Sequence, residues 1–219
     1  MADPRFLSSA LPARIHLAWC GPDVVVLDIE ADEYALLIDA AGVVRPGETA
    51  GAIVVRSDLQ GDLEALGLIL TGAAADDRPA PPARTGEIAL TGVGRPDWGL
   101  AAAALNSIVS SADFQGKSFA ELVATARGRR RAGGRYDAGR AARATAAFQA
   151  VHPFIPFEGD CLQRAYRLHH HLRRTGISAR WVFGVRTWPF LAHCWVQVGD
   201  RIIGDSLDRV AGFTPILAV

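Results

Sequence analysis

Hydrophobic positions in the first part of the chain follow the short period of β-strands. Ile15, Leu17 and Trp19 alternate with polar or small residues, as in a half-buried strand. The β-branched run at 24–29 predicts another strand, and residues 33–38 predict either a third strand or the start of a helix. The beginning of the chain is therefore expected to contain an antiparallel sheet.

Longer apolar periods, typical of helices, follow. Residues 58–70 begin with aspartates and carry five leucines, which predicts a helix. Asp97 can cap a helix that continues to about residue 108, and residues 118–126 and 135–151 predict two more. The middle of the chain is therefore expected to be helical.

A change of composition separates the two regions. Residues 73–87 are rich in alanine, proline and charged residues. Because proline is not tolerated in the interior of a helix, no helix is expected here. We place a linker at 79–87, between a domain at 1–78 and a domain at 88–219. The predicted fold class is α+β.

The segment from 160 onward predicts one capped helix and then strands. Asp160 can accept a hydrogen bond from a free N–H of the first helical turn, which places Cys161 at the helix start, and Gly176 provides the stop. The three strand-like pieces that follow are 179–185, 192–198 and 201–205. Gly199-Asp200 forms the hairpin between the last two.

Bulk composition limits the function classes. The chain has 219 residues, half of them hydrophobic, and a formal net charge of zero. A general nucleic-acid binder needs a basic surface, so we expect no nucleic-acid partner. Residues 23–77 hold twelve acids and two arginines, whereas residues 127–143 hold seven arginines and one acid. We interpret the basic stretch as a solvated loop that could dock a partner.

The cysteine content and the N-terminus predict the compartment. Three cysteines, Cys20, Cys161 and Cys194, form no disulfide framework, which favours a reducing environment. The chain begins without the apolar core of a signal peptide and contains no run long enough to cross a bilayer. We therefore expect a cytoplasmic protein with no membrane partner.

Three residues form a candidate catalytic group. Free N–H groups at a helix start favour a thiolate, so Cys161 is a candidate nucleophile. His193 lies in the middle of a predicted strand, and hairpin pairing brings Asp205 beside it. Taken singly, each residue is more often structural than catalytic, so the prediction depends on the three occurring together.

A metal site is the alternative use of the same residue types. Consecutive residues of a helix point about 100° apart, so His169, His170 and His171 cannot close on one ion. We expect this triplet on the solvated side of its helix. Side chains alternate between the two faces of a strand, so the Cys194 side chain points to the face opposite His193. We therefore predict that Cys194 is a small buried residue. No metal ligands are assigned.

At this point the sequence resembles a known family. The residues that carry the resemblance are FEGDCLQRAYRLHHHLRRTGISARWVFGV and FLAHCWVQVGDRIIGDSLD, which lie within about 150–210. These resemble the transglutaminase-like B proteins of lasso peptide biosynthesis, which use a Cys-His-Asp triad to remove a leader peptide. The resemblance implies that Cys161, His193 and Asp205 are the catalytic triad of a papain-like cysteine peptidase domain.

The resemblance also implies a winged-helix-like domain that recognises the leader, with three strands followed by three helices. Residues 23–38 resemble its second and third strands, and 58–70 resemble its last helix. The leader would add as a strand beside the third strand and pack against that helix. The implied leader-binding residues are Tyr34, Leu36, Leu37, Leu63 and Leu66.

The function implied is cleavage of a lasso peptide precursor at the leader–core junction. An asparagine-synthetase-like cyclase then forms the macrolactam. This chain would bind no cofactor, and any ATP dependence would come through the cyclase. Two other functions stay open: an acyl or amide transferase on the same scaffold, and a peptide-binding module without catalysis.

Overall fold

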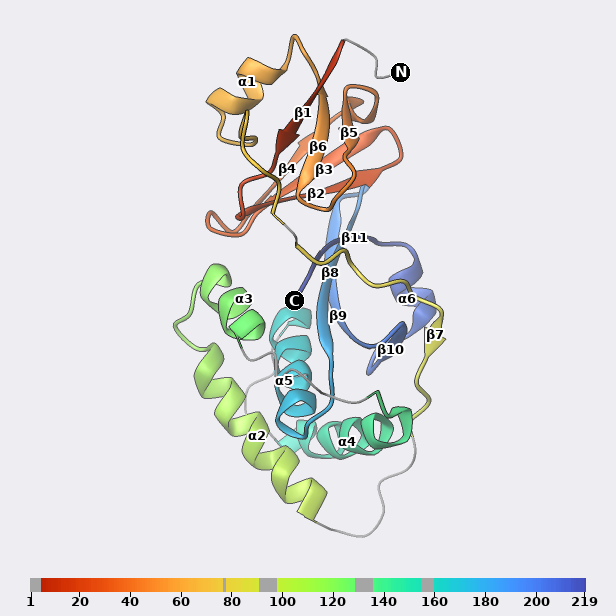
Figure 1. Ribbon diagram of the computed structural model, residues 1–219. Coiled ribbons are helices and arrows are strands. Elements are labelled where there is room, and N and C mark those ends of the chain that lie inside the picture. The colour runs from red at the N-terminus through yellow and green to blue at the C-terminus, as the bar shows by residue number, and fades with distance from the viewer. Residues whose placement is uncertain (1–4, 77, 91–97, 129–135, 155–159) are drawn as a thin grey trace. The chain divides into compact units, whose positions relative to one another are not determined.

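The computed structural model describes residues 5–76, 78–90, 98–128, 136–154 and 160–219. The chain divides into two compact units. The first comprises Met1–Pro81 together with Val185–Leu191 and Thr214–Leu217. The second comprises the remaining segments, from Pro82 onward. Figure 1 shows the strand-rich Met1–Pro81 part of the first unit in red to yellow and the helices between residues 98 and 174 in green to cyan.

Two antiparallel three-stranded sheets make up most of the first unit, in the orders β1-β6-β5 and β2-β3-β4. Their strands are β1 (Phe6–Ala10), β2 (Ile15–Cys20), β3 (Asp23–Asp28), β4 (Glu33–Leu37), β5 (Val44–Pro46) and β6 (Ala52–Arg56). Inward-facing residues from both sheets, such as Ile15, Val26 and Val55, share one buried core. The strands expected at 14–19, 24–29 and 33–38 are confirmed, the last as a strand and not a helix.

The helices expected in the first unit differ from those observed. Within its described residues, the α-helical content is α1 (Gln60–Ala65), beside a 3-10 turn at Ala40–Gly42. Gly67 adopts a positive φ of 67° and ends the helix, and Leu70 forms a bridge with Ala10. The helix predicted over 58–70 is therefore too long, because the chain turns after residue 65 and reaches a β-bridge at Leu70. The three helices of a winged-helix arrangement are not confirmed.

The second unit contains a layer of helices. They are α2 (Trp98–Phe114), α3 (Phe119–Gly128), α4 (Ala138–Val151), a 3-10 turn at His152–Phe154 and α5 (Cys161–Arg174). Helix α2 packs on both α4 and α5, and α4 also contacts α5. Figure 1 shows α5 between α2 and β9. The helical middle region is confirmed, although the predicted cap Asp97 lies outside the described residues, as do 129–135 of the basic stretch.

A five-stranded sheet has the order β11-β8-β9-β10-β7, and all its strands except β7 follow α5 in the chain. Its strands are β7 (Gly86–Glu87), β8 (Arg180–Arg186), β9 (Leu191–Val198), β10 (Arg201–Ile203) and β11 (Thr214–Ala218), and α6 (Leu207–Ala211) precedes β11. β9 and β10 form the predicted hairpin, with Gly199 at a φ of 64°. The end of the segment predicted as linker is part of this sheet, because β7 pairs in parallel with β10.

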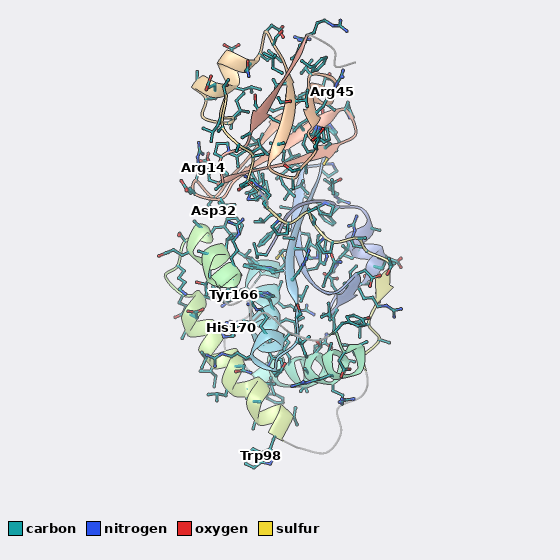
Figure 2. All side chains as sticks on the ribbon, in the orientation of Figure 1. Arg14, Asp32, Arg45, Trp98, Tyr166 and His170 are labelled. Atoms are coloured by element: carbon teal, nitrogen blue, oxygen red, sulfur yellow. The ribbon has the colours of Figure 1, made fainter. Side chains whose placement is uncertain are left out.

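The three consecutive histidines of α5 are buried, so the prediction that they lie on a solvated face is wrong. His169, His170 and His171 are 2%, 5% and 1% exposed. His171 contacts Asn106 of α2 and Phe148 of α4, whereas His169 stacks on Trp181 of β8, so the triplet lies inside the fold. Figure 2 shows His170 beside Tyr166 on α5, and their rings are 6.0 Å apart.

Burial also changes the chemistry of the triplet. The side-chain Nδ2 of Asn106 lies 3.1 Å from Nδ1 of the His171 imidazole, within hydrogen-bonding distance. Burial lowers the pKa of His169 to about 3, so this side chain is neutral at physiological pH.

No helix within the described ranges is both long and apolar enough to cross a membrane.

Candidate active site

Cys161 is the first residue of α5, as the capping pattern predicts. The Asp160 side chain accepts a hydrogen bond from the backbone N of Gln163 at 3.2 Å, which satisfies one free N–H of the first turn. The Cys161 thiol is free and the residue is exposed. The remaining N–H groups and the helix dipole favour negative charge here. Cys161 therefore has the local environment of an activated nucleophile.

His193 and Asp205 meet across the hairpin. Val196 in β9 pairs with Ile203 in β10, so the residues just beyond that pair lie beside each other. His193 Nε2 is 2.6 Å from Asp205 Oδ2, and the two side chains are 13% and 15% exposed. With Nε2 occupied by the carboxylate, Nδ1 is the nitrogen left to face Cys161. The structure thus brings all three predicted catalytic residues into one site.

The second oxygen of Asp205 is held by the start of α6. The backbone N of Ser206 donates to Oδ1 at 2.8 Å, and Arg209 Nη1 lies 3.8 Å from the same atom. Burial would raise the pKa of Asp205, but the hydrogen bonds from His193 and Ser206 outweigh it and lower that pKa overall. Asp205 is therefore a charged acceptor that orients the imidazole.

An aromatic environment surrounds His193. Its ring lies 6.2 Å from that of Trp195, which shares its face of β9 as predicted, and 5.4 Å from that of Phe213. The hydrogen bond to Asp205, and then that to Cys161, raise the pKa of His193 to about 9 despite partial burial. The imidazole is therefore protonated at neutral pH. Phe213 lacked any distinguishing signal in the sequence.

The Cys161 thiol has the opposite shift. Hydrogen bonds from the side chains of Cys194 and then His193 lower the pKa of Cys161 to about 4, against the effect of burial. Between about pH 4 and about pH 9 the pair is consequently a thiolate beside an imidazolium. That is the resting form of a cysteine nucleophile with a proton ready for a leaving group.

Cys194 is buried as predicted, at 4% exposed, but it does not lie away from the site. Its Sγ is 3.3 Å from the backbone O of Cys161, and its thiol also hydrogen-bonds the Cys161 side chain. Strand alternation places the Cys194 side chain on the face of β9 opposite His193, and the first turn of α5 packs against Cys194.

These side chains line one cavity of about 230 Å³, together with Leu168, Trp195 and Gly204. A larger cavity of about 640 Å³ lies among α2, α3 and α5, beside Tyr166, His169 and Arg173. The larger one contains none of the three predicted catalytic residues. The chemistry of the site therefore belongs to the smaller cavity.

The residues predicted to bind a leader fall on two elements of the first unit. Tyr34, Leu36 and Leu37 lie on β4, an outer strand of its three-stranded sheet. Leu37 and Leu63 pack against the core shared by the two sheets, whereas Leu66 is 68% exposed. Leader binding by these residues stays a prediction.

Possible metal ligands do not cluster in the part of the chain that the structure describes. Among those residues, no group of three or more His, Cys, Asp or Glu side chains is placed to hold a metal ion.

Comparison with known proteins identifies the class. A family profile described as the transglutaminase-like superfamily matches residues 104–218, which include the helix, hairpin and cavity just described. The chain belongs to this superfamily. Among curated proteins, it is similar to the microcin J25-processing protein McjB of Escherichia coli, with 46% identity over 50 residues. That alignment covers 23% of this chain and 24% of McjB, so the chain spans about a quarter of its relative. No solved structure matches.

Proposed function

We propose that this protein is a cysteine peptidase that removes the leader from a ribosomally made lasso peptide precursor. The observation that carries the proposal is Cys161 at the capped start of α5, beside an imidazole held by Asp205 at 2.6 Å. Membership of the transglutaminase-like superfamily and the similarity to a microcin-processing protein support it.

The geometry suggests how each residue acts. The Cys161 thiolate attacks the scissile carbonyl carbon, and the backbone N–H of Cys161 at the helix start stabilises the oxyanion. The His193 imidazolium donates its proton to the leaving amine as the C–N bond breaks. The acyl group is now a thioester on Cys161. Neutral His193 then takes a proton from water, which hydrolyses the thioester and regenerates the thiol.

Substrate recognition is proposed for the first unit. Strand β4 is an outer strand, so an extended leader could pair with its free edge and place side chains against Tyr34 and Leu36. The released core peptide would pass to an asparagine-synthetase-like cyclase. This chain would supply no cofactor, and any ATP requirement would belong to that partner.

The test is cleavage of a full-length lasso precursor peptide, carrying both leader and core, followed by mass spectrometry with the cyclase absent and present. We expect the wild type to cut at the leader–core junction and Cys161→Ala to bind the precursor without cutting it. Cys20→Ala, which alters a thiol in β2, is the matched control and retains cleavage. Cleavage by Cys161→Ala at the wild-type rate would overturn the proposal.

An acyl transferase is the second candidate, because transglutaminase-like proteins share the same thioester chemistry. Superfamily membership is the observation that favours it. A primary amine added to the reaction distinguishes the two. Hydrolysis leaves a carboxylate at the cut end of the leader, whereas transfer leaves the amide of the added amine.

A further inference from the structure

A second thiol lies against the candidate nucleophile. The Cys194 Sγ is 3.3 Å from the Cys161 backbone O, and the two side chains hydrogen-bond to each other. Both residues line the same cavity of about 230 Å³, and both are free thiols. Neither the triad chemistry nor the comparisons assign any role to Cys194.

We propose that Cys161 and Cys194 form a peroxide-sensitive dithiol, in which Cys194 converts the oxidised nucleophile into a reversible disulfide. The inference rests on the proposed function only in taking Cys161 as the reactive thiol of the site. It adds regulation of that site by hydrogen peroxide.

The two thiols differ in the properties that decide which one meets the oxidant. Cys161 is exposed, whereas Cys194 is 4% exposed. Hydrogen bonds from Cys194 and His193 hold the pKa of Cys161 at about 4, so a thiolate is present at neutral pH. The pKa of Cys194 is raised well above its ordinary value, first by the Cys161 side chain and then by burial. Peroxide therefore reacts at Cys161.

The reaction balances with peroxide as the only oxidant. The Cys161 sulfur attacks one peroxide oxygen, the O–O bond breaks, and the other oxygen leaves as water after taking a proton. Cys161 is now a sulfenic acid. The Cys194 sulfur attacks the Cys161 sulfur, an S–S bond forms, and the S–O bond breaks to release a second water. Two thiols are oxidised and one peroxide is reduced to two waters.

The first step prepares the second. The largest cause of the raised pKa of Cys194 is its hydrogen bond to the Cys161 side chain; burial comes next, and then the negative charge of the Cys161 thiolate. A sulfenic acid at Cys161 is neutral, so this charge is lost and the pKa of Cys194 falls. Cys194 therefore becomes a better nucleophile once Cys161 is a sulfenic acid, whose sulfur can be attacked.

The consequence is protection of the peptidase site. Without a neighbouring thiol, a sulfenic acid goes on to sulfinic acid, which thiol reductants do not reverse. With Cys194 in contact, the disulfide forms instead and dithiothreitol restores both thiols. The site would be inactive under oxidation and active again after reduction.

The test treats the full chain with a small molar excess of hydrogen peroxide, blocks free thiols and identifies the products by intact mass and peptide mapping. The variant is Cys194→Ser, and Cys20→Ser is the matched control because it removes the third cysteine. We expect the wild type and Cys20→Ser to lose two hydrogens and to yield one linked peptide joining Cys161 and Cys194. We expect Cys194→Ser to gain oxygen atoms at Cys161 that dithiothreitol does not remove.

Oxygen addition at Cys161 in the wild type, with no linked peptide, would overturn the inference, as would a link that includes Cys20. The linked peptide in the wild type decides the matter even if Cys194→Ser fails to fold. The readout does not depend on peptidase activity. A Cys161–Cys194 link without precursor cleavage would leave the inference standing and remove the proposed function, and cleavage with oxygen addition alone would do the reverse.

Discussion

His193 Nε2 lies 2.6 Å from Asp205 Oδ2, across a hairpin whose two strands are joined at Gly199 and Asp200. This contact sets the protonation of the site, because it is the largest cause of the raised pKa of His193. The same contact leaves Nδ1 for Cys161. The hairpin therefore determines both the charge and the orientation of the imidazole.

Replacing Asp205 by Asn is expected to lower the pKa of His193 from about 9 toward the ordinary value of 6.5. The sign follows from charge, because an amide stabilises the imidazolium less than a carboxylate does. The basic limb of cleavage against pH should move to lower pH by the same amount. NMR titration of the histidine ring protons checks the shift independently of any substrate. An unchanged His193 titration in Asp205→Asn would contradict the assignment.

Gly204 is expected to tolerate no side chain. Its φ is 75°, and a Cβ there would lie 2.7 Å from Leu168 Cδ2. Gly204→Ala should lower the free energy of unfolding by about 1–3 kcal/mol and reduce cleavage, because Asp205 is the next residue. Gly212→Ala is the control, since Gly212 has a φ of -76° and open space around it. Equal urea midpoints for the two variants would show that position 204 is not constrained.

The cap of α5 makes a separate prediction. Asp160→Ala removes the acceptor for the Gln163 N–H and should lower the free energy of unfolding by about 1 kcal/mol. Asp160→Ser keeps an acceptor at that position and should recover most of the loss. Urea denaturation measures both variants. A Ser variant as unstable as the Ala variant would exclude capping as the role of Asp160.

Leader binding at β4 is tested by comparing two outer strands of the first unit. Leu36→Ser on β4 should weaken affinity for a fluorescent leader peptide by at least about tenfold, since burial of a leucine contributes about 1.5–3 kcal/mol. Leu7→Ser on β1, an outer strand of the other sheet, should leave affinity unchanged. Fluorescence anisotropy gives both values. Loss of affinity in Leu7→Ser alone would place the leader at the other sheet.

The helix that begins at Cys161 and the β9–β10 hairpin were predictable from local signals. Asp160 before Cys161 is a capping pattern, and Gly199 requires a left-handed φ that marks the turn. Period-two alternation then placed His193 and Trp195 on one face. These features depend on neighbours in the sequence, so the sequence alone indicates them.

Features that depend on packing between distant segments were not predictable in the same way. Three consecutive histidines are polar and would be expected at the surface, yet α2, α4 and β8 bury them. The 58–70 helix is cut short because Leu70 pairs with Ala10, sixty residues earlier in the chain. Cys194 was correctly placed in the interior, but its contact with Cys161 depends on how α5 packs against β9.

The most direct measurement of the central claim is the pH dependence of Cys161 alkylation by iodoacetamide, located by peptide mapping. A thiolate stabilised by hydrogen bonds from Cys194 and His193, with a pKa of about 4, should react at pH 6 within about twofold of its rate at pH 8. An ordinary thiol with a pKa of about 8.5 reacts about 75-fold more slowly at pH 6 than at pH 8, because its thiolate fraction falls by that factor. A steep fall between pH 8 and pH 6 at Cys161 would contradict the account.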